Sequence, residues 1–216
     1  MIIAIDGPSG SGKGTIAKKL ASTLNYTYID TGAMYRCVSL KSLRENLKET
    51  DEEKIVDLLK NMDIKLTNDG KVFMDNEDVS DEIRSLKVTH RVSKISSIIP
   101  LREIMRQKQR QFAKKTSIVM EGRDITTEVF PDADYKFYLD ASVDERAKRR
   151  FLQNKEKKIK STIDEVKNAI IERDYDDMNR KVGSLRRTND QIYIDSTNMT
   201  IDEVLKKMLE VIKKWI

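Results

Sequence analysis

The sequence predicts an α/β fold in which helices cover both faces of one parallel sheet. Two observations support this class: short apolar runs alternate with helical patterns, and a glycine-rich loop joins the first run to the first helix. Five runs are predicted to be buried strands, at residues 2–6, 26–30, 117–121, 135–140 and 191–195. Helices are predicted at residues 51–61, 99–114, 143–153, 163–176 and 201–216, the last one including Trp215. A chain of 216 residues then has room for one domain, residues 1–216, with a small insertion.

The loop after the first strand has the composition of a phosphate-binding loop (P-loop). It reads Gly7-Pro8-Ser9-Gly10-Ser11-Gly12-Lys13-Gly14-Thr15. Its glycines let backbone N–H groups at a helix N-terminus approach an anion, and Lys13 adds a mobile positive charge. An apolar strand precedes the loop and a helical pattern follows it. We therefore predict a nucleoside triphosphate site in a P-loop NTPase-type three-layer fold, rather than a flexible Gly/Ser loop. The first strand starts at residue 2, so we expect no cleaved leader peptide.

One segment interrupts the alternation of strands and helices. Residues 63–67 and 71–75 are short alternating runs separated by Asn68-Asp69-Gly70, a strong signal for an antiparallel hairpin. A hairpin has no natural place inside a parallel sheet, so we predict an inserted antiparallel subdomain at about residues 36–98. A second irregular stretch, residues 153–160, is dense in charge. It predicts a short mobile lid at about residues 150–165, although a solvated helix end fits the composition equally well.

Arginines follow two of the predicted strands at their carboxyl ends. Arg36 lies just after the second strand, and Arg123 follows the third. Ligands bind at this edge of an open α/β sheet, and arginine offers bidentate, permanently charged recognition of phosphate oxygens. Either residue alone could equally form a surface ion pair. Two of them at the phosphate edge favour a binding site.

Two predicted helices carry further arginines on one face. These sets are Arg173 with Asp177 and Arg180, and Arg146 with Arg149 and Arg150. Their spacing places each set on one side of its helix, where an exposed salt-bridge ladder is the more common explanation. Phosphoryl transfer, however, needs converging cations rather than a strong base. Both sets are therefore candidates for a phosphate site.

The composition argues against several other kinds of chemistry. His90 is the only histidine and Cys37 the only cysteine, so a Cys/His zinc cluster, a Ser-His or Cys-His nucleophile and an internal disulfide are not expected. The net charge of +5 is spread along the chain, and no apolar run approaches the roughly 20 residues that span a membrane. We expect a cytoplasmic protein with neither a nucleic acid nor a membrane as partner.

Acidic residues end three of the predicted strands: Glu121, Asp140 and Asp195. Mg²⁺ keeps several waters and takes few protein ligands, so the sequence does not choose firmly among them. Glu121 is the preferred metal residue, acting through water, because it flanks Gly122-Arg123-Asp124.

Several stretches taken together resemble the bacterial cytidylate kinases, a family of nucleoside monophosphate kinases. The resemblance spans nearly the whole chain. It rests on residues 5–15, 29–36, 121–125, 129–133, 137–142, 145–150 and 173–180. It implies reversible transfer of the γ-phosphoryl of ATP to CMP or dCMP with Mg²⁺, in pyrimidine nucleotide metabolism. It also implies that the insertion at about residues 36–98 binds the nucleoside monophosphate. We expect the protein to be a monomer.

The resemblance implies roles for the matched residues in phosphate binding. Lys13 and the amides of the P-loop would hold the ATP phosphates, and Arg173 would act near the transferring phosphoryl. Three arginines would hold the acceptor phosphate: Arg36, Arg123 and Arg180. Lys13, Arg173 and Arg123 are the predicted catalytic residues. Arg146, Arg149 and Arg150 would be the arginines of the lid.

The resemblance also implies how the nucleoside is recognised. Thr31 and Asp177 would meet the sugar hydroxyls. Ser93, Arg102 and Asp124 would read the cytosine edge. Cytosine offers an amino donor beside two acceptors, which an acidic or hydroxyl acceptor and an arginine donor complement.

Three residues depart from the usual pattern of the family. Thr126 replaces a glycine, Ser184 replaces a proline and Glu128 replaces an apolar residue, so local loop geometry and CMP selection are expected to differ. Another small-molecule P-loop kinase, such as a shikimate-type enzyme, would not need the cytosine-reading set. An ATP-dependent switch module or an RNA-binding protein are further alternatives. The RNA binder should show aromatic platforms among its basic residues, whereas aromatics make up only 6% of the chain.

Overall fold

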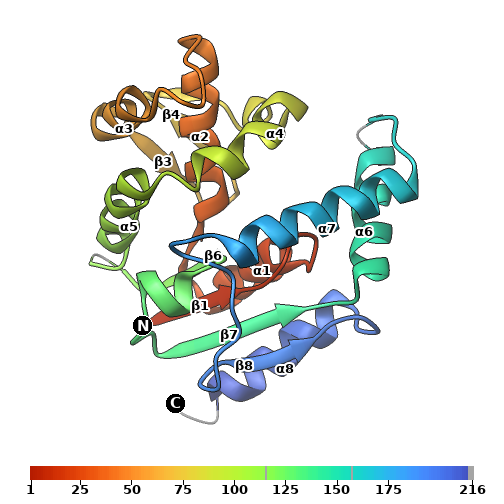
Figure 1. The fold of residues 1–216 in the computed structure, drawn as a ribbon. Coiled ribbons are helices and arrows are strands. Elements are labelled where there is room, and N and C mark those ends of the chain that lie inside the picture. Colours follow the sequence, from red (N-terminus) through yellow and green to blue (C-terminus); the bar gives the residue numbers. More distant parts are fainter. Residues whose placement is uncertain (115, 157, 214–216) are drawn as a thin grey trace.

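A computed structural model describes residues 1–114, 116–156 and 158–213, and its centre is a five-stranded sheet (Figure 1). The strands are β1 (Ile2–Asp6), β2 (Thr27–Asp30), β6 (Ile118–Gly122), β7 (Tyr135–Asp140) and β8 (Ile192–Asp195). Their order is β2-β6-β1-β7-β8, and every neighbouring pair is parallel. The five predicted strands and the α/β class are therefore confirmed.

Helices connect and cover these strands. They are α1 (Lys13–Leu24), α2 (Thr31–Arg44), α3 (Glu52–Asn61), α4 (Leu86–Ile95), α5 (Ile99–Phe112), α6 (Val143–Glu156), α7 (Ile163–Asn179) and α8 (Ile201–Lys213). A 3-10 turn, η1 (Glu82–Arg84), precedes α4, and a π-helical turn, η2 (Ile125–Val129), follows β6. α2 and α4 were not among the predicted ranges. Residues 214–216, and with them Trp215, lie outside the described residues.

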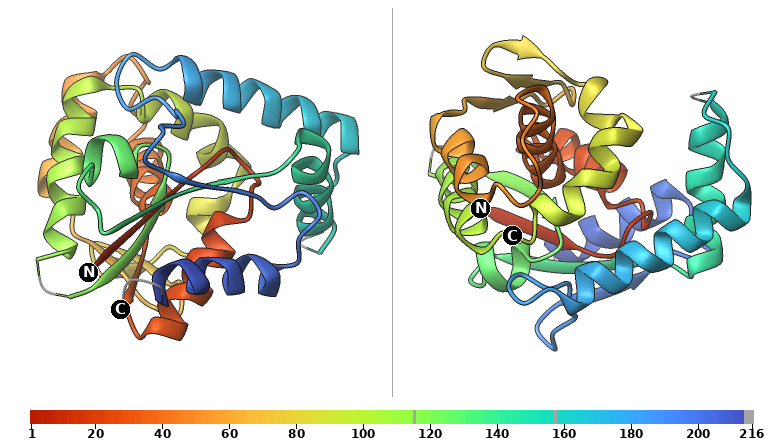
Figure 2. Two further views of the ribbon diagram at one scale, coloured as in Figure 1. Left: turned by 90° about the horizontal axis from the view of Figure 1, so that it is seen from below. Right: turned by 45° about the horizontal axis from the view of Figure 1, so that its top comes forward.

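The side chains of β1 alternate between the two faces of the sheet, as the two-residue period of a strand requires. Ile3 and Ile5 pack with α1 and α8 in one buried cluster, and Ala4 packs with η2 in another. Figure 2 shows α8 lying alongside α1 below the sheet. Since both faces of β1 are covered, the P-loop that follows it emerges from a rigid support.

A second hydrophobic core lies outside the sheet. Its buried residues run from Ala33 in α2 to Met105 in α5 and include Ile55, Ile83 and Ile95, each with no exposed surface. Figure 1 shows this part of the chain standing beside the sheet, with α2 entering it. The proposed boundary at residue 36 falls within α2, and the boundary at residue 98 directly precedes α5. Both boundaries of the insertion remain predictions.

The predicted hairpin is present as β3 (Ile64–Leu66) and β4 (Val72–Met74), which pair antiparallel. A third strand, β5 (Glu77–Asp78), was not predicted because it is two residues long and exposed. It follows a turn in which Asp75 and Asn76 adopt positive φ angles of 51° and 70°. Short polar side chains tolerate this conformation best among residues other than glycine.

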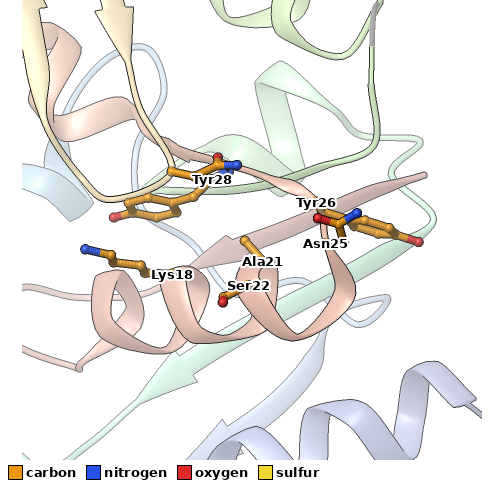
Figure 3. A pocket seen from close by; sticks show the side chains of 7 residues that line it. Lys18, Ala21, Ser22, Asn25, Tyr26 and Tyr28 are labelled. Atoms are coloured by element: carbon orange, nitrogen blue, oxygen red, sulfur yellow. The ribbon is translucent and has the colours of Figure 1, made fainter.

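The hairpin turn contacts the main sheet at its β2 edge. The Tyr28 amide donates to Asn68 Oδ1 over 3.1 Å, and Lys18 Nζ donates to the carbonyl of Asp69 over 2.5 Å. A cavity of about 150 Å³ lies here. Figure 3 shows its lining, with Lys18 and Tyr28 at one end and Asn25 and Tyr26 at the other. None of the predicted site residues lines this cavity, so we assign the active site elsewhere.

The predicted lid region falls on the junction of α6 and α7. α6 continues to Glu156, so residues 153–156 are helical, as the alternative of a solvated helix end predicted. Lys157 lies outside the described residues. α7 begins with a capping box in which the Glu165 amide donates to Thr162 Oγ1 and the Thr162 amide donates to Glu165 Oε2. Within the described part of the chain, no helix has the length and apolar character needed to cross a membrane.

Candidate active site

The P-loop turns directly from β1 into α1. Gly10 and Gly12 have φ angles of 79° and 88°, in the left-handed region that glycine adopts without strain. Gly12 is the N-cap of α1, so the first free amides of the helix face the loop. A Cβ on Gly10 would lie 3.2 Å from Arg146 Cβ, which shows how closely α6 packs against the loop. The result is a concave set of amides suited to an anion.

Lys13 and Glu121 are buried at the base of this loop. Lys13 Nζ donates to the Pro8 carbonyl over 2.9 Å and is 6% exposed. Burial, with Arg123 next in importance, lowers the pKa of Lys13, whereas burial and Asp30 raise the pKa of Glu121. Both charges are therefore costly where they stand. An anion bound in the loop would stabilise the ammonium form of Lys13.

Several arginines crowd the carboxyl edge of the sheet. Arg36 Nη1 donates to the Ile83 carbonyl over 3.0 Å and to Thr89 Oγ1 over 2.8 Å. Burial, and then the charge of Arg173, lower the pKa of Arg36 to about 9. The Arg173 guanidinium forms no hydrogen bond or ion pair with the described residues, and burial followed by Arg123 lowers its pKa to about 10. The two groups stay cationic at neutral pH and repel each other, which favours a shared anion.

Asp177 lies between two of the predicted phosphate-binding arginines. Its Oδ2 accepts from Arg123 Nε and its Oδ1 accepts from Arg180 Nη2, both over 2.7 Å. Burial alone would raise the pKa of Asp177, but Arg123, Arg173 and Arg180 together lower it to about 2. The Asp177 and Arg180 side chains are only 5% and 7% exposed, so the exposed salt-bridge ladder is wrong for this helix face.

Two of the three residues predicted to read the base lie together. Arg102 Nη2 donates to Asp124 Oδ2 over 2.5 Å, and Arg102 Nη1 donates to the Ser96 carbonyl over 2.8 Å. Arg102 is 1% exposed, and its buried Nε has no hydrogen-bond partner. Ser93 is not a partner of this pair, since its hydroxyl donates to Asp176 Oδ2 on α7 over 3.0 Å.

Thr31 uses its hydroxyl to hold the end of the neighbouring strand. Its Oγ1 donates to the Glu121 carbonyl over 2.8 Å, and the side chain is buried. Asp30 caps α2 by accepting from the Ala33 amide over 2.9 Å. These two bonds fix the start of α2, the helix that carries Arg36.

The arginines of α6 differ from one another in environment. Arg146 is 5% exposed, and its Nη1 donates to the Ser9 carbonyl over 2.9 Å. Arg149 Nη1 donates to the Ser11 carbonyl over 3.4 Å, and its Nη2 donates to the Ser196 carbonyl over 2.6 Å. Arg150 is exposed and forms no hydrogen bond or ion pair with the described residues. Arg146 and Arg149 therefore hold the backbone of the P-loop through its carbonyl groups. The alternative of an exposed salt-bridge ladder on this helix face does not account for these two residues.

The departures from the family pattern are accommodated by specific contacts. Thr126 Oγ1 donates to the fully buried Asp6 over 2.6 Å, and Gln191 Nε2 donates to Thr126 over 2.5 Å. Burial raises the pKa of Asp6 to about 6, against the lowering effect of the hydrogen bonds from Thr126 and from the Ile125 amide. Glu128 Oε2 accepts from Arg106 over 2.9 Å, which balances its charge near the base-reading loop.

Sequence reasoning missed two residues of this region. Arg84, in η1, lies within electrostatic range of Arg36 and Arg150. Asp174, on α7, accepts from the Ser9 amide over 3.0 Å. Neither residue follows the end of a predicted strand, and neither belongs to the helical spacings that drew attention to the other charged residues. Only the position of Asp174 beside Arg173 could have drawn attention to it.

Comparison of the sequence with known proteins assigns the chain to a family. A family model described as cytidylate kinase matches residues 3–214. The chain belongs to the cytidylate kinase family. A cytidylate kinase from Caldanaerobacter subterraneus subsp. tengcongensis is 49% identical over 212 residues, covering 98% of this chain and 94% of the relative. A cytidylate kinase from Clostridioides difficile (strain 630) is 42% identical over 209 residues, covering 97% of this chain and 96% of the relative.

Solved structures with low sequence identity share the fold of this cytidylate kinase family member. The crystal structure of an uncharacterized protein from Eubacterium ventriosum ATCC 27560 matches with a TM-score of 0.55 at 15% identity, covering 99% of this chain and 98% of that one. TT1252 from Thermus thermophilus matches with a TM-score of 0.51 at 17% identity, covering 100% and 98%. The predicted family, kinase class and fold are confirmed, and a switch module or an RNA-binding protein is not supported.

Proposed function

We propose that this cytidylate kinase family member transfers the γ-phosphoryl group of ATP to CMP or dCMP, giving ADP and the nucleoside diphosphate. The buried Arg102–Asp124 pair is the observation that carries this choice of acceptor. Arg102 Nε has no partner, and Asp124 Oδ1 accepts no hydrogen bond from the described residues. Because Arg102 Nε is itself buried, Asp124 Oδ1, held in place by Arg102, is the acceptor that remains for the edge of a base. Cytosine, with an amino donor beside ring acceptors, complements that pattern.

The cationic groups supply the rest of the chemistry. The amides of the P-loop and Lys13 bind the ATP phosphates, and Arg36, Arg123 and Arg180 bind the phosphate of the acceptor. Arg173 feels the charge of Asp177 but forms no hydrogen bond or ion pair with the described residues, and it stabilises charge on the transferring group. Phosphoryl transfer depends mainly on such positioning and electrostatic stabilisation, so no strong general base is required. Asp177 and Thr31 meet the sugar hydroxyls, and Ser93 joins the base-reading pair.

The residues present also fit Mg²⁺ held through water. The Glu121 carboxylate lies beside the P-loop: a Cβ on Gly14 would be 3.2 Å from Glu121 Oε1, and no donor from the described residues bonds to that carboxylate. The described residues hold no group of three or more His, Cys, Asp or Glu side chains that could bind a metal by themselves. This agrees with an ion held mainly by water and phosphate oxygens, whose bound chemistry is charge neutralisation on ATP.

Two structural proposals accompany the reaction. The part of the chain built around the second core, about residues 36–98, is the subdomain that binds the monophosphate, and residues 150–165 form the lid. Arg36 and Arg102, on the helices that flank this core, support the first assignment. Arg150, exposed at the start of the lid, supports the second. The enzyme is further proposed to act as a monomer in the cytoplasm.

A coupled assay of ADP formation tests the function. CMP, dCMP, UMP, AMP and shikimate are offered separately with Mg-ATP. We expect turnover concentrated in CMP and dCMP. Equal turnover with UMP would contradict base reading by Arg102 and Asp124. An absence of turnover with all five acceptors, despite measurable ATP binding, would overturn the proposed reaction.

A further inference from the structure

Asp174 and Arg146 hold both backbone groups of one P-loop residue. The Ser9 amide donates to Asp174 Oδ1 over 3.0 Å, and the Ser9 carbonyl accepts from Arg146 Nη1 over 2.9 Å. The same Arg146 Nη1 also donates to Asp174 Oδ2. All three residues are less than 10% exposed. A closed, charge-assisted cycle therefore joins α6, α7 and the P-loop.

This cycle is anchored to the sheet as well. Arg146 Nε donates to the carbonyl of Ala141, the residue after β7, over 2.9 Å. The Arg146 guanidinium thus spans the end of β7, the P-loop and α7. Gly10 lets the backbone of α6 come close enough for these contacts, because a Cβ there would lie 3.3 Å from the Arg146 carbonyl oxygen. The loop and the two helices are held as one unit at this point.

Asp174 directly follows Arg173 on α7. Arg173 has no hydrogen-bond or ion-pair partner among the described residues, so its place depends on where α7 lies. The bond from Asp174 to Ser9 is a direct contact between α7 and the P-loop, one residue from Arg173. A misplacement of about 1 Å can cost roughly 100-fold in rate when a reaction depends on positioning.

We propose that Asp174 is a positioning residue: together with Arg146 it ties the P-loop to α7 and so sets the place of Arg173 relative to the ATP phosphates. The inference rests on the proposed role of Arg173. Asp174 touches the loop backbone and Arg146 rather than a substrate. Its effect on the rate is therefore expected to pass through Arg173.

The test is a double-mutant cycle on the full-length enzyme. Asp174→Asn keeps the side-chain shape and an oxygen for the Ser9 amide but removes the charge opposite Arg146. We expect it to lower kcat at least about tenfold while KM for CMP changes less than about twofold. In an Arg173→Ala background the same substitution should lower kcat by less than about twofold, because the group that it positions is gone. Glu172→Gln, the exposed neighbour on the other side of Arg173, is the matched control and should change kcat less than about twofold in either background.

Each contrary outcome is decisive. An unchanged kcat in Asp174→Asn, or an equal fold-loss in both backgrounds, would show that Asp174 does not act through Arg173. Full activity in Arg173→Ala alone would remove the proposed role of Arg173, and this result is distinguishable from a failure of Asp174. Circular dichroism and thermal melting establish that the variants fold. Should Asp174→Asn not fold, Arg146→Lys replaces it under the same two criteria, since it keeps the buried positive charge.

Discussion

Arg102 and Asp124 form a buried ion pair over 2.5 Å, with side chains 1% and 8% exposed. Arg102 comes from α5, beside the second core, and Asp124 follows β6 of the main sheet. The Arg102 guanidinium also lies over the Tyr35 ring, 5.5 Å from its centroid. A charged pair at this depth is costly to desolvate and strongly destabilising to break. We propose that recognition of a base accounts for its position between the sheet and the insertion.

Asp124→Asn should weaken the preference for CMP over UMP. Uracil presents a carbonyl oxygen where cytosine presents an amino group, so a carboxylate rejects uracil and an amide can donate to it. We expect the ratio of kcat/KM values, CMP over UMP, to fall by about tenfold or more. Asp132→Asn, at an exposed position downstream, is the control. An unchanged ratio in Asp124→Asn would remove Asp124 from base reading.

Gly183→Ala should disrupt the Arg102–Asp124 ion pair, because Gly183 packs directly against both side chains. Gly183 has a φ of 66°, and an added Cβ would overlap Arg102 Nη2 and lie 2.5 Å from Asp124 Oδ2. The backbone strain costs about 1–2 kcal/mol and the overpacking about 1–3 kcal/mol. We expect a lower melting temperature and a raised KM for CMP. Ser184→Ala, at the next residue, should leave both near wild type, and a wild-type Gly183→Ala enzyme would show that the contact is not maintained.

Asp177 should make folding stability depend on pH in the acidic range. Its pKa is lowered from 3.8 to about 2, so its stabilising contribution is present above pH 4 and is lost as the pH falls towards 2. At pH 6 Asp177→Asn should lower the free energy of unfolding by about 2 kcal/mol or more, and the gap should narrow below pH 4.

Urea unfolding of the wild type and Asp177→Asn between pH 2.5 and pH 6 measures this difference in the free energy of unfolding. We expect the pH at which the difference begins to narrow to lie within about one unit of pH 4. The exposed Glu172→Gln serves as the control for a general loss of charge on α7. A gap of constant size across the range would contradict the role assigned to the Asp177 charge.

Substitution by valine should affect the folding stability differently at the adjacent residues Thr126 and Thr127. Thr126→Val removes the hydroxyl that donates to Asp6 and accepts from Gln191, so two buried polar groups lose a partner. We expect about 1–3 kcal/mol of destabilisation, measured by urea unfolding. Thr127 Oγ1 is buried with no hydrogen-bond partner, so Thr127→Val should be neutral or stabilising. Equal effects at the two positions would contradict the assigned hydrogen bonds.

Much of the fold could be predicted because its signals are local. The five strands of the sheet, the P-loop and the hairpin each depend on periodicity or turn residues within a short window. β5 was missed because two exposed residues carry no period, and α2 because its first residues resemble a loop after a strand. The end of α6 was placed too early, since a charged helix end and a charged loop have similar composition.

The candidate site was predicted only in part, because only some of its residues carry a local signal in the sequence. Arg36 and Arg123 could be found because the carboxyl ends of parallel strands meet at one edge. The resemblance named Arg102 and Asp124, but nothing in their spacing indicates that they pair in a buried position. Arg146 belonged to a face that composition describes as solvated, yet it is 5% exposed.

The chain's local structure, its phosphate-binding loop and the resemblance to its family could all be read from the sequence alone. The pairing of buried charges depends instead on the three-dimensional arrangement of the strands and helices. The Ser9 amide and Asp174 are 165 residues apart in the chain, and Asp6 and Thr126 are 120 apart. Such pairs form because strand order and helix packing bring distant segments together. In these pairs a partner offsets the desolvation of the buried charge, and that partner is set by position in space rather than by position in sequence.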